Sequence, residues 1–272
     1  MDTKTEAIRI GIGGWVYEPW RGRFYPKGWQ QRRELEFASR HVTTIEINST
    51  YYAAQKPETY VRWRDAVPDG FIFSVKAPKR ITQSRQLASP GAQVDAFLSD
   101  LLNLGDRLGP VIWQLDRNAR VDREDFTAFL AHIPDTLEGR RLRHVLDVRD
   151  AAFVDADYVA LARSRGMAIV HTDAPDLPQI ADISADFVYA RLMRSRAGIE
   201  TGYPDEELDS LALLARSWAR GEDPADLPHV SPVAAPVQPR EVFLYFISAA
   251  KERNPAAGMA LLRKLGIETQ GL

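Results

Sequence analysis

Short runs of β-branched and aromatic residues alternate with amphipathic segments along the chain, and this alternation constrains the fold more than any other feature. Eight of these runs have the pattern of strands, and helical patterns separate most of them. The expected strands cover residues 8–13, 42–47, 71–76, 111–115, 143–148, 167–171, 187–191 and 241–247. The expected helices cover residues 31–41, 57–67, 92–108, 123–133, 155–165, 204–220 and 255–265.

Strands that alternate with helices in an unchanging pattern predict an α/β fold with a parallel sheet. Eight such units in 272 residues match the size of a TIM barrel, so we expect a single (β/α)8 TIM-barrel domain over residues 1–272. A doubly wound open sheet is the alternative fold. The count of eight strands and the lack of the full dinucleotide-binding glycine pattern weigh against it.

Composition excludes several classes of function. The chain has 35 basic and 37 acidic residues, so its net charge of -2 gives no general affinity for nucleic acid. It has no cysteine, which excludes disulfides, thiolate metal sites and a cysteine nucleophile. We expect a cytoplasmic protein without a membrane partner, because the sequence shows neither a signal-peptide pattern nor a long apolar segment.

The segment 42–52, which reads VTTIEINSTYY, combines a strand pattern with polar groups near its end. Alternate residues of a strand face opposite sides, so the two isoleucines of this run lie opposite Glu46 and Asn48. Ligands of TIM barrels bind at the carboxyl ends of the strands. Glu46 is therefore a candidate site residue, and a buried structural carboxylate is the alternative interpretation.

A long aromatic loop is expected after the first strand, over residues 16–30. Paired glycines before Trp15 allow the sharp turn that begins it. Long loops in compact domains are often functional. We expect the loop aromatics to form a packed lid, with Trp20 and Phe24 buried against the barrel top. Residues 221–239, rich in Pro and Ala, are expected to be a more mobile surface excursion.

Polar side chains also follow the later expected strands. Because the carboxyl ends of all eight strands meet at one mouth, we expect these side chains to cluster there. The candidate substrate-binding residues are Trp15, Asn48, Tyr52, Gln114, Arg149, Asp173 and Arg191. The candidate catalytic residues are Glu46, Lys76 and Asp147.

The candidates allow two kinds of catalysis. Glu46 with Asp147, or Glu46 with Asp173, can divide acid and base roles if their surroundings separate their pKa values. A desolvated Lys76 can act as a Schiff-base nucleophile. We expect instead that Lys76 is the cationic partner of Glu46, because buried charges need pairing.

A metal site is a further alternative. His171 and Asp173 are two residues apart on an expected strand, so one face can present both together with Glu46 or Asp147. Such a nitrogen and oxygen set suits Zn²⁺ or Mn²⁺. The chain lacks an HExxH or HxH pattern, and a histidine satisfied in the core is the favoured interpretation of His171. We therefore expect no metal and no cofactor.

Basic residues concentrate in three loops that follow expected strands. Solvated loop charge explains each cluster separately, but their convergence on one end of a barrel favours an anionic ligand. TIM barrels often bind phosphate near their last two strands, and arginine binds phosphate bidentately. The clusters are Arg21, Arg23, Lys27, Arg32 and Arg33, then Lys76, Lys79, Arg80 and Arg85, and finally Arg191, Arg194 and Arg196.

Several of these runs together resemble the YecE-like family, domain of unknown function 72. The most specific are IGIGGWVYEPWRGRFYPKG and VTTIEINSTYYAAQKPETYVRW, and GFIFSVKAPKRIT, LGPVIWQL, LRHVLDVRD, MAIVHTDAP, FVYARL and EVFLYF follow at the expected spacing. The resemblance covers almost the whole chain and implies a TIM barrel. It implies no particular reaction.

The chain departs from this family pattern at three strand ends. Relatives usually have Glu-Phe-Arg-His where residues 147–150 read DVRD, and Arg-Leu-His-Gly where residues 191–194 read RLMR. They often have two asparagines where residues 247–248 read IS. One half of the mouth therefore keeps the family pattern and the other half is altered.

We expect an enzyme of the hydrolase or lyase kind that acts on a small anionic, phosphate-bearing substrate. In this hypothesis Glu46 and Asp147 form the acid–base pair, and Lys76, Arg149 and Arg191 hold the negative charge. The altered strand ends favour a non-catalytic ligand-binding protein as an alternative. A nucleic-acid-binding or nuclease-like barrel is a third class, supported by analogy of fold alone.

Overall fold

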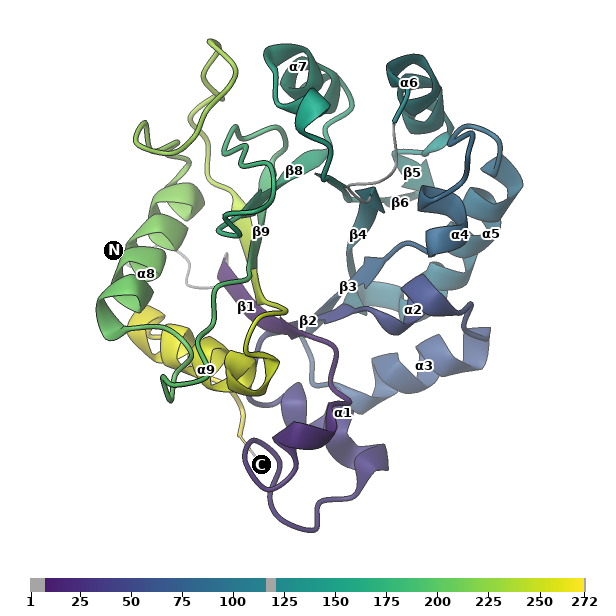
Figure 1. Cartoon of the computed structure of the whole chain (residues 1–272). Coiled ribbons are helices and arrows are strands. Elements are labelled where there is room, and N and C mark those ends of the chain that lie inside the picture. The colour runs from purple at the N-terminus through teal and green to yellow at the C-terminus, as the bar shows by residue number, and fades with distance from the viewer. Residues whose placement is uncertain (1–7, 116–120, 272) are drawn as a thin grey trace.

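The computed structural model describes residues 8–115 and 121–271. Eight parallel strands close a barrel in the order β1-β10-β9-β8-β7-β4-β3-β2, which confirms the predicted TIM barrel. Figure 1 looks into the barrel, with the helices packed outside the ring of strands. The strands are β1 (Ile8–Gly13), β2 (Thr44–Ile47), β3 (Ile72–Lys76), β4 (Leu108–Leu115), β7 (His144–Val148), β8 (Ala168–Thr172), β9 (Phe187–Leu192) and β10 (Glu241–Phe246).

The helical layer is complete except at one position. Between β8 and β9, residues 173–186 form no helix. The main helices are α1 (Glu34–Ala38), α3 (Pro57–Ala66), α5 (Gly91–Leu101), α6 (Arg123–His132), α7 (Ala156–Ser164), α8 (Asp205–Arg220) and α9 (Asn254–Leu265). Single turns α2 (Ser49–Tyr52) and α4 (Lys79–Thr82) follow β2 and β3. Within the described part of the chain, no helix combines the length and apolar character needed to cross a membrane.

Two expected helices differ from the structure. The helix expected over 92–108 ends at Leu101 and continues as a 3-10 segment, Leu102–Arg107, inside which Gly105 adopts a positive, non-helical φ of 53°. The helix expected over 31–41 begins with a 3-10 turn, Gln31–Arg33, before α1. A small antiparallel hairpin of β5 (Thr136–Leu137) and β6 (Arg140–Arg141) was not expected.

The barrel interior is partly polar. Tyr245 of β10 and Thr44 of β2 share a hydroxyl hydrogen bond of 2.8 Å, and Ser74 of β3 donates to Tyr189 of β9 at 2.5 Å. β1 presents Gly11 where β2 passes closely, since a Cβ at this residue would lie 2.3 Å from the carbonyl oxygen of Thr44. Hydrogen bonds of tyrosine hydroxyls thus connect strands inside the barrel, below the mouth.

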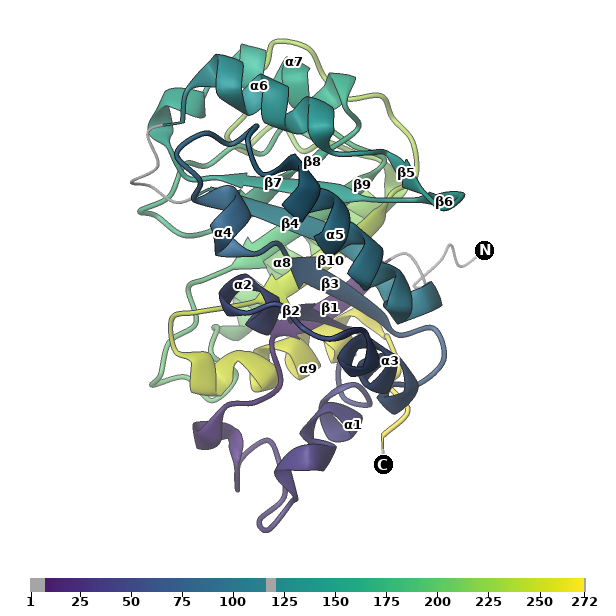
Figure 2. The same ribbon diagram turned by 90° about the vertical axis from the view of Figure 1, so that its right-hand side faces the viewer.

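The aromatic loop over 16–30 packs against the side of the barrel and does not cover the barrel top as a lid. Trp20 and Phe24 are buried as predicted. However, Phe24 packs edge-to-face on Phe37 of α1 at 5.3 Å, and Trp20 donates from Nε1 to the carbonyl of Lys251 at 2.8 Å. Figure 2 shows this segment at the side of the barrel next to α1. The expectation of a lid across the barrel top is therefore wrong, because α1 supplies the apolar surface that these rings cover.

Candidate functional site at the barrel mouth

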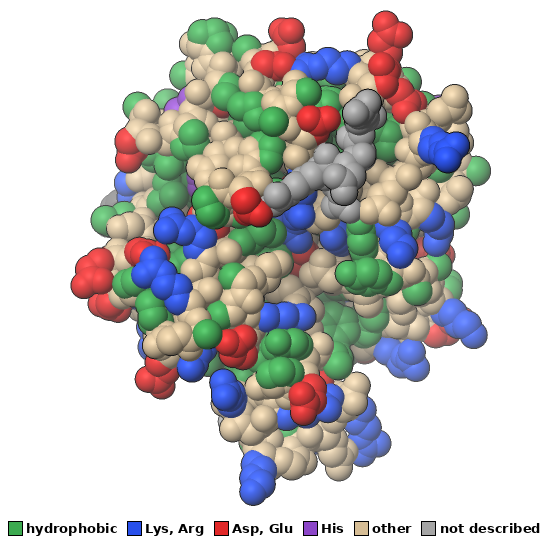
Figure 3. Space-filling model, in the orientation of Figure 1, with side chains coloured by type: hydrophobic (Ala, Val, Ile, Leu, Met, Phe, Trp, Pro, Cys, Tyr) green, Lys and Arg blue, Asp and Glu red, His purple; other side chains and the backbone are tan. Residues whose placement is uncertain are grey.

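A cavity of about 420 Å³ opens among the carboxyl ends of the strands. This volume lies within the range of small-molecule sites. In Figure 3, lysine and arginine side chains gather around the hollow at the centre of this face. Seven predicted site residues line the cavity: Trp15, Asn48, Tyr52, Lys76, Gln114, Arg149 and Arg191.

Arg191 is the centre of the cavity floor. Its side chain is 3 % exposed and comes from the inner face of β9. Nη2 donates to Glu46 Oε1 at 2.9 Å, while Nη1 donates to Asp147 Oδ2 at 2.6 Å. Burial alone would lower the pKa of Arg191, but the two carboxylates raise it above its ordinary value. Arg191 therefore remains charged inside the barrel.

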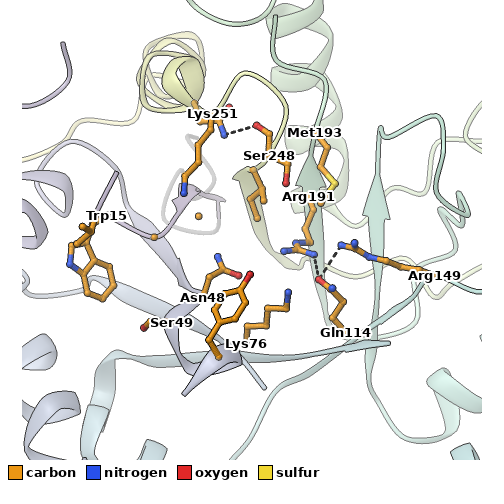
Figure 4. Close-up of a pocket in the computed structure, with 16 residues that line it drawn as sticks. Trp15, Asn48, Ser49, Lys76, Gln114, Arg149, Arg191, Met193, Ser248 and Lys251 are labelled. Carbon is orange, nitrogen blue, oxygen red and sulfur yellow. Dashed lines mark hydrogen bonds between the residues drawn. The ribbon is translucent and has the colours of Figure 1, made fainter. Parts of the chain in front are cut away.

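Arg149 and Gln114 extend this network to one side of the floor. Arg149 Nη2 and Arg191 Nη1 each donate to Gln114 Oε1 at 3.0 Å, as Figure 4 shows. Arg149 also contacts Asp147 at 3.0 Å. Burial would raise the pKa of Asp147, but Arg191 and Arg149 outweigh this effect and hold it below its usual range. Asp147 is thus a paired carboxylate that positions two guanidinium groups.

Glu46 lies beneath the cavity and is fully buried. Its Oε1 accepts from Arg191, and its Oε2 accepts from Tyr189 Oη at 2.7 Å. The inward direction of Glu46 agrees with the strand alternation in the sequence. The expected ion pair between Glu46 and Lys76 is wrong, because the buried arginine and tyrosine occupy both carboxylate oxygens.

Lys76 instead has an aromatic partner. The side chain leaves the end of β3 toward the cavity, and the residue is 8 % exposed. Its Nζ lies 3.8 Å from the centroid of the Tyr51 ring, a cation–π distance. Burial and the nearby Arg191 lower the pKa of Lys76 to about 8. Among the described residues, its ammonium forms no ion pair.

Asp173 is at the same end of the barrel but does not line the cavity. Its Oδ1 accepts from the backbone nitrogen of Met193 at 2.5 Å, and its Oδ2 accepts from Tyr203 Oη at 3.0 Å. These bonds connect the ends of β8 and β9 to the segment before α8. Asp173 thus holds two loops together by hydrogen bonds. It does not join the other predicted substrate-binding residues in the cavity lining.

His171 faces out of the barrel. Its ring packs edge-to-face on Trp218 of α8 with centroids 5.2 Å apart. Burial lowers its pKa to about 4. Glu46 and Asp147 point into the barrel, so the strand wall separates them from His171. The alternative of a metal held by His171 with either carboxylate is therefore wrong, and the described residues contain no other cluster with three suitable His or acidic ligands.

Comparison with known proteins decides the family. The model of "Protein of unknown function DUF72" matches residues 9–272, almost the entire chain. The chain belongs to the DUF72 family. The resemblance inferred from the sequence motifs is thereby confirmed.

One curated relative and two solved structures are similar to this chain. The curated relative "UPF0759 protein YecE" of Escherichia coli K12 is 34% identical over 146 residues, which cover 54% of this chain and 50% of the relative. The match thus spans about half the length of that protein. A DUF72 structure from Thermotoga maritima aligns with a TM-score of 0.73 at 18% identity, over 95% of this chain and 98% of that one. One from Enterococcus faecalis gives 0.69 at 15% identity, over 96% of each chain. At this identity the structures show a shared fold alone.

Lys251 is a cavity residue of this DUF72 chain that the sequence reasoning missed. It follows β10 in a short 3-10 turn, Lys251–Arg253, and its Nζ lies 4.6 Å from the centroid of the Tyr17 ring. Burial lowers its pKa. Its neighbours Ser248 and Ala249 have positive φ angles of 61° and 45°, a conformation that the sequence did not signal. Met193, Ile247, Ser248 and Asn254 also line the cavity and were not predicted.

Most of the predicted basic clusters of the DUF72 chain do not reach the cavity. Arg21 pairs with Glu34, and Arg196 pairs with Glu207. Of the twelve clustered cations, Lys76 and Arg191 line the cavity. The cations of the cavity therefore come as single residues from the ends of β3, β7, β9 and β10. They do not come from three converging basic loops, as was expected.

Proposed function

We propose that this DUF72 protein binds a small anionic molecule, bearing a phosphate or carboxylate, at the mouth of the barrel. The observation that carries this proposal is the charge of the cavity lining. Lys76, Arg149, Arg191 and Lys251 line it, and no acidic residue does so among the described residues. An anion in such a cavity gains charge-assisted hydrogen bonds that a neutral ligand cannot form.

The carboxylates of Glu46 and Asp147, which lie beneath the cavity, support anion binding more directly than they support acid–base chemistry. Glu46 and Asp147 hold Arg191 from below, which orients its guanidinium and offsets the cost of burying it. We propose a hydrolase or lyase of the cytoplasm that acts on the bound anion. A non-catalytic binding protein is the second candidate, favoured by the ion pairs that occupy both carboxylates. The nuclease-like alternative keeps only its analogy of fold, because His171 faces outward and cannot join Glu46 or Asp147 in a metal site.

Calorimetric titration with sulfate, in the presence of a chelator, tests this proposal. Lys76→Met keeps most of the apolar stem but removes the charge, so the binding free energy should weaken by about 1–3 kcal/mol. Lys76→Arg is the matched control, because it keeps a positive charge and should retain most of the affinity. Unchanged affinity in a folded Lys76→Met variant would remove Lys76 from the site. Loss of wild-type binding on chelation would indicate a metal instead.

A further inference from the structure

We propose that Lys76 is a catalytic amine that forms a reversible imine with a small aldehyde or ketone carrying a carboxylate or phosphate. This inference rests on the proposed anion site and names the substrate class and the reacting atom. It follows from where Lys76 lies, what it contacts, and which groups lie opposite it.

The position of Lys76 is that of a nucleophile on a rigid support. It is the last residue of β3, a strand paired on both sides in the barrel wall, so its backbone is held in place. Its stem is buried, and the Tyr51 ring lies 3.8 Å from Nζ. In Figure 4 the Nζ atom points toward Gln114 and Arg191 across the cavity floor. The amine can therefore meet a ligand that Arg191 holds.

The surroundings of Lys76 leave part of its amine unprotonated near neutral pH. Burial and the cationic Arg191 bring its pKa to about 8 from an ordinary 10.5. They outweigh the opposing charges of Glu46 and Asp147, neither of which forms an ion pair with Lys76. At pH 7 a lysine with a pKa of 8 has about one amine in ten unprotonated, against about one in three thousand at 10.5. A lysine desolvated beside another cation is a recognised form of activated amine.

Arg149 and Arg191 supply the complementary half of the site. Their guanidinium groups converge on the same atom, Gln114 Oε1, with each donor 3.0 Å away. Two such groups side by side suit a carboxylate or phosphate. A carbonyl next to that anionic group then faces Lys76 from within the same cavity. This arrangement selects carbonyl compounds that also carry a negative charge.

The chemical step conserves atoms and charge without a further reagent. The unprotonated nitrogen of Lys76, whose proton has passed to solvent, attacks the carbonyl carbon, and the electron pair of the C=O π bond moves onto oxygen. Transfer of one hydrogen from nitrogen to oxygen then gives a carbinolamine. The C–O bond then breaks, and the oxygen leaves as water after it takes up a proton from solvent, which replaces the proton that Lys76 released. The remaining hydrogen stays on the iminium nitrogen, so the positive charge of the ammonium is retained. Hydrolysis reverses the same step and releases the free lysine.

Reductive trapping tests the inference. The full-length protein is incubated with glyoxylate or pyruvate and sodium cyanoborohydride, and modified lysines are mapped by peptide mass spectrometry. We expect one stable adduct on Lys76, at least about tenfold above the exposed Lys27, because Lys76 is desolvated in the cavity and lies opposite Arg149 and Arg191. Added sulfate should suppress this adduct. Lys76→Arg should lose it while still binding sulfate, whereas Lys27→Arg should behave as wild type.

The outcomes separate this inference from the proposed function. Sulfate binding without a Lys76 adduct, or with equal labelling of Lys76 and Lys27, would overturn imine formation and leave the anion site standing. Absence of both sulfate binding and the adduct would overturn both. Because the adduct is mapped on the wild-type protein, the result does not depend on the folding of the Lys76→Arg variant.

Discussion

Nη2 of Arg191 donates to Oε1 of Glu46 at 2.9 Å, and this contact joins residues that lie 145 positions apart in the chain. Both side chains are almost fully buried, at 3 % and 0 % exposure. A buried charge that loses its partner leaves an uncompensated charge in a medium of low polarity. The pair therefore links the chemistry of the mouth to the stability of the barrel.

Arg191→Met should lower the free energy of unfolding by about 3–5 kcal/mol, because it leaves Glu46 and Asp147 buried without their shared cation. Urea unfolding followed by circular dichroism measures this loss. Arg196→Met removes an exposed ion pair with Glu207 and should cost about 0.2–1 kcal/mol. Equal losses in the two variants would show that the buried network does not stabilise the fold.

Sulfate affinity should fall as pH rises through about 8. Lys76 is charged below this pKa and neutral above it, while Arg149 and Arg191 stay charged. Arg191, Glu46, Arg149 and Asp147 are the charged groups that act on Lys76, and bound sulfate adds a charge that raises its pKa further. Affinity is thus constant below the free pKa and declines above it. Calorimetry from pH 6.5 to 9.5 measures the profile, and Lys76→Arg should abolish the decline near 8.

Asp173→Ala should destabilise the protein without weakening sulfate binding. It leaves the Met193 amide and the Tyr203 hydroxyl without their acceptor, which costs about 1–3 kcal/mol when such donors are buried. Thermal unfolding and sulfate titration of the same sample give both quantities. Asp226→Ala, at an exposed position, should stay within about 0.5 kcal/mol of wild type. Normal stability with lost binding would return Asp173 to the substrate site.

Trp20→Ala should lower the free energy of unfolding by about 3–5 kcal/mol, because it leaves a cavity among the packed aromatic side chains of residues 16–30. The variant should also be cleaved faster by trypsin at the arginines of this segment. Val237→Ala, at a residue that is 83 % exposed, serves as the control and should leave the unfolding midpoint unchanged. A Trp20→Ala protein as stable as this control would show that the loop packs only loosely on the barrel.

Strand alternation made much of the barrel predictable. The run through Glu46 and Asn48 showed an apolar and a polar face, and the structure places Glu46 inside, opposite the buried isoleucines. Alternation identifies two sets of residues on a strand, but it does not say which set faces inward when both are apolar. In β8, Ile169 and Val170 are both buried, so the outward direction of His171 was not decided by local pattern.

The sequence by itself determined eight parallel strands, their approximate limits, and seven of the residues that line the mouth, because these depend on local periodicity and on chain length. Tertiary structure alone decided the charge pairing. Glu46 pairs with Arg191 and not with Lys76, whose ammonium lies over the Tyr51 ring. Lys251 lines the cavity from the turn after β10. Such pairings depend on the register and closure of strands far apart in the chain, where a shift of one residue exchanges inside for outside.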